Sequence, residues 1–208
     1  MSADPGPARD ATLAADVGAA IFGPPAMEGI RVRFSDGIIS RLDPYGLVSR
    51  PGLLHRVADA MVQHLPDRTE AIAGLELAGI PLAAALSYRT GLPAVFVRRA
   101  VAADPDGARV EGADVRGRHV VVVDVLTDSG ATMTSGIRAV RRAGAQTSIA
   151  VSVVDVQHGA RARTVRSEVE LVPLFGVTEL PQPRVHRPGL PSLSRSSRSD
   201  SLLGRLFA

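Results

Sequence analysis

Small, hydroxylated and acidic side chains follow the most apolar strand-like segment of the chain. Residues 119–123 read HVVVV, Asp124 comes next, and residues 126–132 read LTDSGAT. A β-branched run that is apolar on both faces suits a buried parallel strand, and a turn of such small residues exposes backbone N–H groups and hydroxyls. Residues 134–143 then predict an amphipathic helix that ends at Gly144. Loop amides and a helix N-terminus that point at one spot favour a bound phosphate.

A second segment repeats this order of elements earlier in the chain. Residues 71–74 predict a short buried strand and residues 76–79 (ELAG) a tight loop. Residues 80–90 predict a helix with Pro81 in its first turn, where the missing N–H costs nothing. Residues 93–97 predict the next strand. Strand, loop, helix and strand in this order predict a parallel sheet with a right-handed crossover.

The two segments together resemble the type I phosphoribosyltransferases, and the earlier one is similar to the orotate phosphoribosyltransferase branch of that family. The similarity rests on Gly-x-Glu-x-Ala-Gly-Ile-Pro from Gly74, Thr-Gly-Leu-Pro from Thr90, and Phe-Val-Arg ending at Arg98. The resemblance implies an α/β fold of the phosphoribosyltransferase type, with a parallel sheet, helices on both faces and a small N-terminal hairpin or hood. It also implies transfer of 5-phosphoribosyl from phosphoribosyl pyrophosphate (PRPP) to orotate in pyrimidine nucleotide biosynthesis, with release of pyrophosphate.

The resemblance also assigns roles to individual residues. PRPP would be bound by residues after the first strand, by two arginines and by the loop after the second strand, namely Glu76, Leu77, Ala78, Gly79, Arg98, Arg99, Asp124, Val125, Leu126, Thr127, Asp128, Ser129, Gly130, Ala131 and Thr132. The catalytic residues would be Asp124, toward the ribose hydroxyls, and Arg99, toward the pyrophosphate charge. The acceptor base would meet Thr127, Arg161 and Arg163. The cofactor would be Mg²⁺, held through PRPP rather than directly by the protein, and the enzyme would be a homodimer.

Three positions depart from the family pattern where chemistry is expected. Val123 stands where an acidic residue would precede Asp124, Ala102 stands where a loop lysine would lie, and Val156 replaces an arginine that would hold the orotate carboxylate. These departures leave open a PRPP-binding homologue with a different acceptor base or a regulatory, weakly catalytic role. An unrelated nucleotide-binding α/β protein is disfavoured, because the Gly-x-Gly-x-x-Gly and Gly-Lys-Ser/Thr motifs are missing.

Periodicity and turn signals predict the remaining elements. We expect helices over residues 11–22 and 52–64, a hairpin of strands 30–34 and 38–42, a loop over 44–51, a long lid loop over 99–117, and strands over 147–154 and 168–175. Together these elements would form one phosphoribosyltransferase-like domain over residues 11–180. Residues 1–10 and the Pro/Ser/Arg-rich tail 181–208 are predicted to be disordered.

Composition limits the other classes of protein. The chain has 208 residues, 45% of them hydrophobic, and no cysteine, so disulfides and thiolate zinc sites are excluded. No apolar run approaches the roughly 20 residues of a membrane span, and the first residues lack signal-peptide order, so we expect a cytoplasmic protein without a membrane partner. All 24 basic residues are arginine, the net charge is only +3, and five of the arginines lie in the tail. The near-neutral remainder does not indicate nucleic-acid binding.

Overall fold

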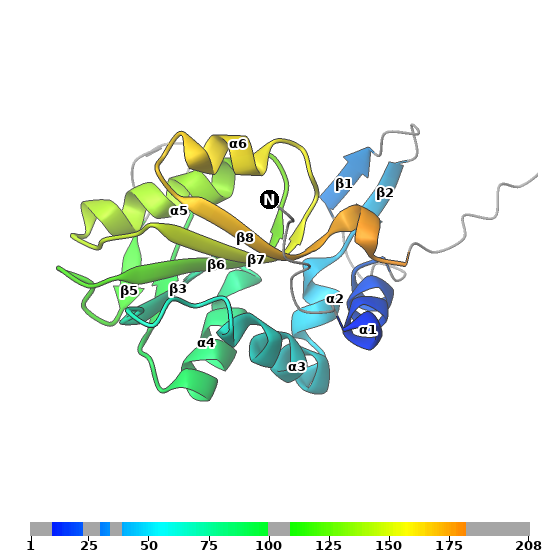
Figure 1. Cartoon of the computed structure of the whole chain (residues 1–208), viewed down its shortest axis with the longest axis horizontal. Helices are drawn as coiled ribbons and strands as arrows, with labels where there is room; N and C mark the ends of the chain where they lie inside the picture. Colours follow the sequence, from blue (N-terminus) through cyan, green and yellow to red (C-terminus); the bar gives the residue numbers. More distant parts are fainter. Residues whose placement is uncertain (1–9, 23–29, 34–38, 100–108, 182–208) are drawn as a thin grey trace, which may run out of the picture.

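The structure is a computed structural model that describes residues 10–22, 30–33, 39–99 and 109–181 (Figure 1). The helices are α1 (Ala11–Ile21), α2 (Pro44–Val48), α3 (Pro51–Val62), α4 (Gly79–Thr90), α5 (Ala131–Arg142), α6 (Ala160–Val165) and the 3-10 turn η1 (Val177–Glu179). The strands are β1 (Ile30–Arg33), β2 (Ile39–Leu42), β3 (Ala71–Leu75), β4 (Ala94–Val97), β5 (Val110–Gly112), β6 (Val120–Thr127), β7 (Ile149–Asp155) and β8 (Glu170–Gly176). Among these described residues, no helix is both long enough and apolar enough to cross a membrane.

The main sheet has six strands in the order β5-β4-β3-β6-β7-β8. Strands β4, β3, β6, β7 and β8 run parallel, and β5 pairs with β4 in the antiparallel direction. The central strand β6 is buried along its length except at Asp124, which is half-buried. This explains the uninterrupted valine run, because a strand covered on both faces needs apolar side chains in both directions.

Helices cover both faces of this sheet, as predicted (Figure 1). On one face, α3 and α4 pack in a hydrophobic core that also contains Val121 and Val123 of β6. On the other face, α5 packs in a second core with Val120 and Val122. The alternation follows from strand geometry, which sends successive side chains to opposite sides of the sheet. The hairpin of β1 and β2 forms a separate antiparallel sheet, also as predicted.

The chain changes its winding direction between β3 and β6. From β3 the chain crosses through α4 to β4, and from β6 it crosses through α5 to β7 on the opposite side. The loops that leave the carboxyl ends of β3 and β6 therefore separate, which opens a crevice between two hydrogen-bonded neighbours. In open α/β sheets this switch point is where ligands bind.

Two of the predicted loops are wrong in part. Residues 44–48 form α2, because Asp43 accepts the backbone N–H of Tyr45 at 2.9 Å and Pro44 fills the first turn. Residues 110–112 form β5, which pairs with the edge of β4 instead of remaining in a loop. The helix α6 was not predicted. The rest of the expected lid, with Ala102, lies outside the described residues, as do residues 1–9 and 182–208 of the segments expected to be disordered.

Gly74 holds β3 against the start of α4, and it gives a test of this packing. A Cβ at Gly74 would overlap the carbonyl oxygen of Gly79 and lie 2.7 Å from the Cβ of Ala83. We expect Gly74→Ala to lower the free energy of unfolding by about 1–3 kcal/mol in urea denaturation, because backbone must move to make room.

The matched control is Gly52→Ala on α3, where an added Cβ meets nothing within 4 Å. This variant should be as stable as the wild type or up to about 1 kcal/mol more stable, since alanine favours helix. Equal stability of Gly74→Ala and the wild type would contradict the close packing of β3 on α4.

Candidate active site

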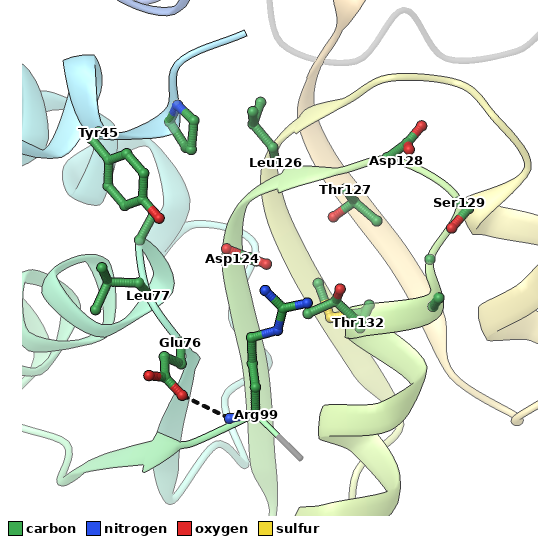
Figure 2. Close-up of a pocket in the computed structure, with 15 residues that line it drawn as sticks. Tyr45, Glu76, Leu77, Arg99, Asp124, Leu126, Thr127, Asp128, Ser129 and Thr132 are labelled. Atoms are coloured by element: carbon green, nitrogen blue, oxygen red, sulfur yellow. Dashed lines mark hydrogen bonds between the residues drawn. The ribbon is translucent and has the colours of Figure 1, made fainter. Parts of the chain in front are cut away.

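A cleft of about 440 Å³ lies at the carboxyl ends of β3 and β6 (Figure 2). It is where the change of winding direction predicts a ligand site. The lining residues come from α2, from the loop after β3, from the end of β4 and from the end of β6 through the start of α5, namely Pro44, Tyr45, Glu76, Leu77, Ala78, Arg99, Asp124, Leu126, Thr127, Asp128, Ser129, Gly130, Ala131, Thr132 and Met133. Most of the predicted PRPP-binding residues therefore meet in one cleft.

Two helices begin at this cleft without a side-chain cap. α5 starts at Gly130, whose φ of 76° lies in the left-handed region, and no side chain of the described chain caps its first turn. α4 starts after Ala78, again without a side-chain cap. By contrast, Asp10 and Asp43 cap α1 and α2. Uncapped N–H groups and the positive ends of two helices make the cleft suitable for an anion with two charged groups.

The hydroxyl of Thr127 is available to a ligand. Thr127 is 3% exposed and lines the cleft. Its Oγ1 atom has no hydrogen-bond partner among the described residues. Because buried polar atoms in folded proteins are almost always paired, an unpaired hydroxyl facing a cleft indicates a missing partner, such as a phosphate or sugar oxygen.

Asp124 lines the cleft, and the pKa of its carboxyl group is raised. Burial raises the pKa of Asp124 to about 7, against the opposing effects of the Val125 N–H, which donates to Oδ1 at 2.8 Å, and of the charge on Arg99. Near neutral pH the side chain is therefore divided between a hydrogen-bond donor and an anion. Either form can hydrogen-bond a sugar hydroxyl.

Arg99 reaches the same point from the end of β4. Figure 2 shows its guanidinium between Asp124 and Thr132. The backbone N–H of Arg99 donates to Oε2 of Glu76 at 2.8 Å, so the loop after β3 holds the residue that enters the cleft. The peptide bond between Glu76 and Leu77 is cis. Within the described part of the chain, Arg99 is the only basic residue that lines the cleft.

Three of the predicted PRPP-binding residues do not line the cleft. Arg98 lies 3.7 Å from the carboxylate of Glu111 and lines an adjoining hollow of about 230 Å³, which shares Glu76, Arg99, Ala131 and Thr132 with the cleft. Val125 is buried in the core. Gly79 is a packing position, because a Cβ there would lie 2.8 Å from the carbonyl oxygen of Val123.

Arg161 and Arg163, expected at the acceptor base, also lie outside the cleft. Arg161 pairs with Asp155 at 3.5 Å in a separate cavity at the ends of β7 and β8. Arg163 donates from Nε to the carbonyl oxygen of Ser129 at 2.8 Å, on the α6 side of the loop. Both side chains project from α6, which the sequence analysis missed, and they are engaged by Asp155 and by the backbone of Ser129.

The family departures Val123 and Val156 are both buried core residues. Neither side chain lines the cleft. Pro44, Tyr45 and Met133 do line it and were missed. An Asp-Pro pair is a helix-start signal, so α2 could have been predicted from Asp43 and Pro44, although its position beside the cleft could not.

Together the parallel sheet and the cleft at its switch point define an α/β fold of the class that binds ligands at the carboxyl ends of its strands. Residues 47–173 match the family model described as a phosphoribosyl transferase domain. The chain belongs to the type I phosphoribosyltransferase family.

Similar proteins carry a more specific name. The orotate phosphoribosyltransferase of a Nocardioides species is 34% identical over 172 residues, which is 82% of this chain and 94% of that protein. The crystal structure of orotate phosphoribosyltransferase from Aeropyrum pernix is 26% identical, with a TM-score of 0.63 over 72% of this chain and 87% of that chain. The Mycobacterium tuberculosis enzyme in complex with PRPP has the same fold, with a TM-score of 0.66 and 22% identity over 81% of this chain and 96% of that chain.

The pKa of Asp124 predicts a pH-dependent stability. Since the folded chain binds this proton more tightly than the unfolded chain, with a pKa of about 7 instead of 3.8, Asp124 lowers the free energy of unfolding as pH rises from about 4 to about 7. We expect Asp124→Asn to gain stability relative to the wild type between pH 5 and pH 8 in urea denaturation. Asp67→Asn, at an exposed position outside the cleft, serves as the control. A difference between Asp124→Asn and the wild type that is the same at both pH values would contradict the raised pKa.

Proposed function

We propose that this chain is an orotate phosphoribosyltransferase, which transfers 5-phosphoribosyl from PRPP to orotate and releases pyrophosphate. The observation that carries the proposal is the pair of uncapped helix N-termini at one cleft, with the unpaired Thr127 hydroxyl and Asp124 between them. PRPP carries its phosphate and its pyrophosphate on opposite sides of a ribose. Its two charged groups can therefore each meet one helix N-terminus, with the ribose at Thr127 and Asp124 between them. The names of the relatives support orotate as the acceptor.

The loop from Thr127 to Thr132 and the first turn of α5 hold the 5′-phosphate in this proposal, through N–H groups and hydroxyls. Asp124 hydrogen-bonds the ribose hydroxyls, and the backbone of residues 76–78 faces the pyrophosphate. During transfer the ribose C1–oxygen bond breaks and its electron pair leaves with pyrophosphate. A ring nitrogen of orotate, which gives up its proton to solvent, forms the new C1–nitrogen bond. Arg99 stabilises the charge on the departing group, because its guanidinium already lies in the cleft.

The acceptor base is proposed to lie against the wall formed by α2. Figure 2 shows Tyr45 on this wall, across the cleft from Thr127 and Thr132. Leu77 and Leu126 also line the cleft, and flat apolar and aromatic surface of this kind suits a planar base. Thr127 keeps its proposed role at the base as well as at PRPP.

Mg²⁺ is the proposed cofactor, and it neutralises charge on PRPP when bound. No group of three His, Asp or Glu side chains within the described ranges could hold a metal ion. In this proposal the ion is held by PRPP oxygens rather than directly by the protein, since oxygen atoms are the ligands that Mg²⁺ prefers. The homodimer and the cytoplasmic location remain predictions.

The function is tested by calorimetric titration of the full chain with PRPP and Mg²⁺, followed by an assay of pyrophosphate release on addition of orotate. We expect saturable PRPP binding and release that depends on orotate, with uracil and adenine as control acceptors. Absence of PRPP binding would overturn the site. Binding without orotate-dependent release would overturn the acceptor.

Thr127→Val tests the phosphate-binding loop. We expect PRPP to bind about tenfold more weakly, because the variant removes a hydroxyl that has no hydrogen-bond partner to lose among the described residues. Thr147→Val is a matched control, since Thr147 is also buried with an unpaired Oγ1 but does not line the cleft. Equal loss of PRPP affinity in both variants, measured by the same titration, would contradict a direct contact with Thr127.

A further inference from the structure

Asp128 creates an electrostatic problem inside the phosphate-binding loop. It lines the cleft one residue after Thr127 and two residues before Gly130, the residue that precedes α5. A carboxylate at this point repels a bound phosphate. It is also well placed to accept the free N–H groups at the start of α5, as acidic residues commonly do just before a helix, and these are the donors that phosphate needs.

The structure holds this carboxylate away from the centre of the cleft. In Figure 2 the side chain of Asp128 points away from Arg99 and Asp124. Nδ1 of His158, in the connection between β7 and α6, lies 2.6 Å from Oδ1 of Asp128. At this separation the two atoms share a hydrogen bond, which fixes the direction of the carboxylate.

This pair belongs to a continuous contact between two segments. Three successive residues of the loop each touch residues 158–163. Asp128 contacts His158, the carbonyl oxygen of Ser129 accepts a hydrogen bond from Nε of Arg163 at 2.8 Å, and Gly130 packs so tightly that a Cβ there would lie 2.9 Å from Cα of Ala160. The 158–163 segment therefore sets the shape of the loop from outside the cleft.

We propose that His158 is a positioning residue for PRPP binding, which holds Asp128 outward through this hydrogen bond. This inference rests on the proposed function. Without His158, the carboxylate turns toward the first turn of α5 and competes with the 5′-phosphate for its N–H groups. The other charged groups around Asp128 are Asp124 and Arg99 across the cleft and Arg161 and Arg163 on α6, and Arg161 and Arg163 are already engaged by Asp155 and by the loop backbone.

A double-mutant cycle tests the proposal by titration of the full chain with PRPP and Mg²⁺. We expect His158→Ala to weaken PRPP binding about tenfold, since the Asp128 carboxylate is then free to turn toward the bound phosphate. Asp128→Asn should tighten binding about threefold. The double variant Asp128→Asn/His158→Ala should bind as tightly as Asp128→Asn, because in this proposal His158 affects PRPP binding only through the carboxylate of Asp128.

Steady-state kinetics give a readout that a purely structural role would not. His158→Ala should raise KM for PRPP by about the same factor as Kd while kcat changes much less, because the loss falls on binding. His55→Ala, at an exposed position of α3, is the control and should bind PRPP like the wild type. Thermal unfolding of each variant shows that it is folded.

The possible failures are distinguishable. If the wild type does not bind PRPP, the proposed function fails and takes this inference with it. If the wild type binds and His158→Ala binds equally well, or if the double variant is as weak as His158→Ala, the inference alone is overturned. If His158→Ala does not fold, Asp128→Asn decides, and weaker binding by Asp128→Asn overturns the role of His158.

Discussion

A single ligand can contact two phosphate-binding loops only if the strands that carry those loops are neighbours. In this chain β3 and β6 are hydrogen-bonded in the middle of the sheet, and their outgoing loops turn in opposite directions. The start of α4 packs closely against both strands because glycine lies at the contacts. A Cβ at Gly74 of β3 would overlap Gly79 of α4, and a Cβ at Gly79 would lie 2.8 Å from the carbonyl oxygen of Val123 in β6. The cleft, the two free helix ends and the position of Asp124 all depend on this packing.

The cleft combines acidic side chains with a site for an anion, and each acid is restrained differently. Three acidic residues line it among the described residues, Glu76, Asp124 and Asp128. Asp124 is largely protonated below its raised pKa of about 7. Glu76 accepts the backbone N–H of Arg99, and Asp128 pairs with His158. A site with three free carboxylates would repel phosphate. Because each acid is restrained by these contacts, the partial positive charge of the two helix N-termini can dominate the electrostatic potential in the cleft.

Two departures from the family pattern have a packing explanation. The side chain of Val123 is on the opposite face of β6 from Asp124, and both Val123 and Val156 are core residues. An acid at position 123 in this chain would be a buried charge without a partner, which is costly. Among the described residues, Arg99 is the basic residue that lines the cleft. The wall opposite Thr127 is formed by α2 with Tyr45.

The sequence by itself determined the parts of the site that are contiguous along the chain. The valine run, Asp124, the loop to Thr132 and the amphipathic helix could be predicted together, because strand burial, turn chemistry and helix periodicity are local properties of the chain. The parallel sheet followed from the order of these elements, and the helices on both of its faces followed from the resemblance to the family. Local patterns do not report which distant segments meet. Only the tertiary structure decided that Arg161 and Arg163 turn away from the cleft, that α2 forms one of its walls, and that His158 meets Asp128 thirty residues earlier in the chain.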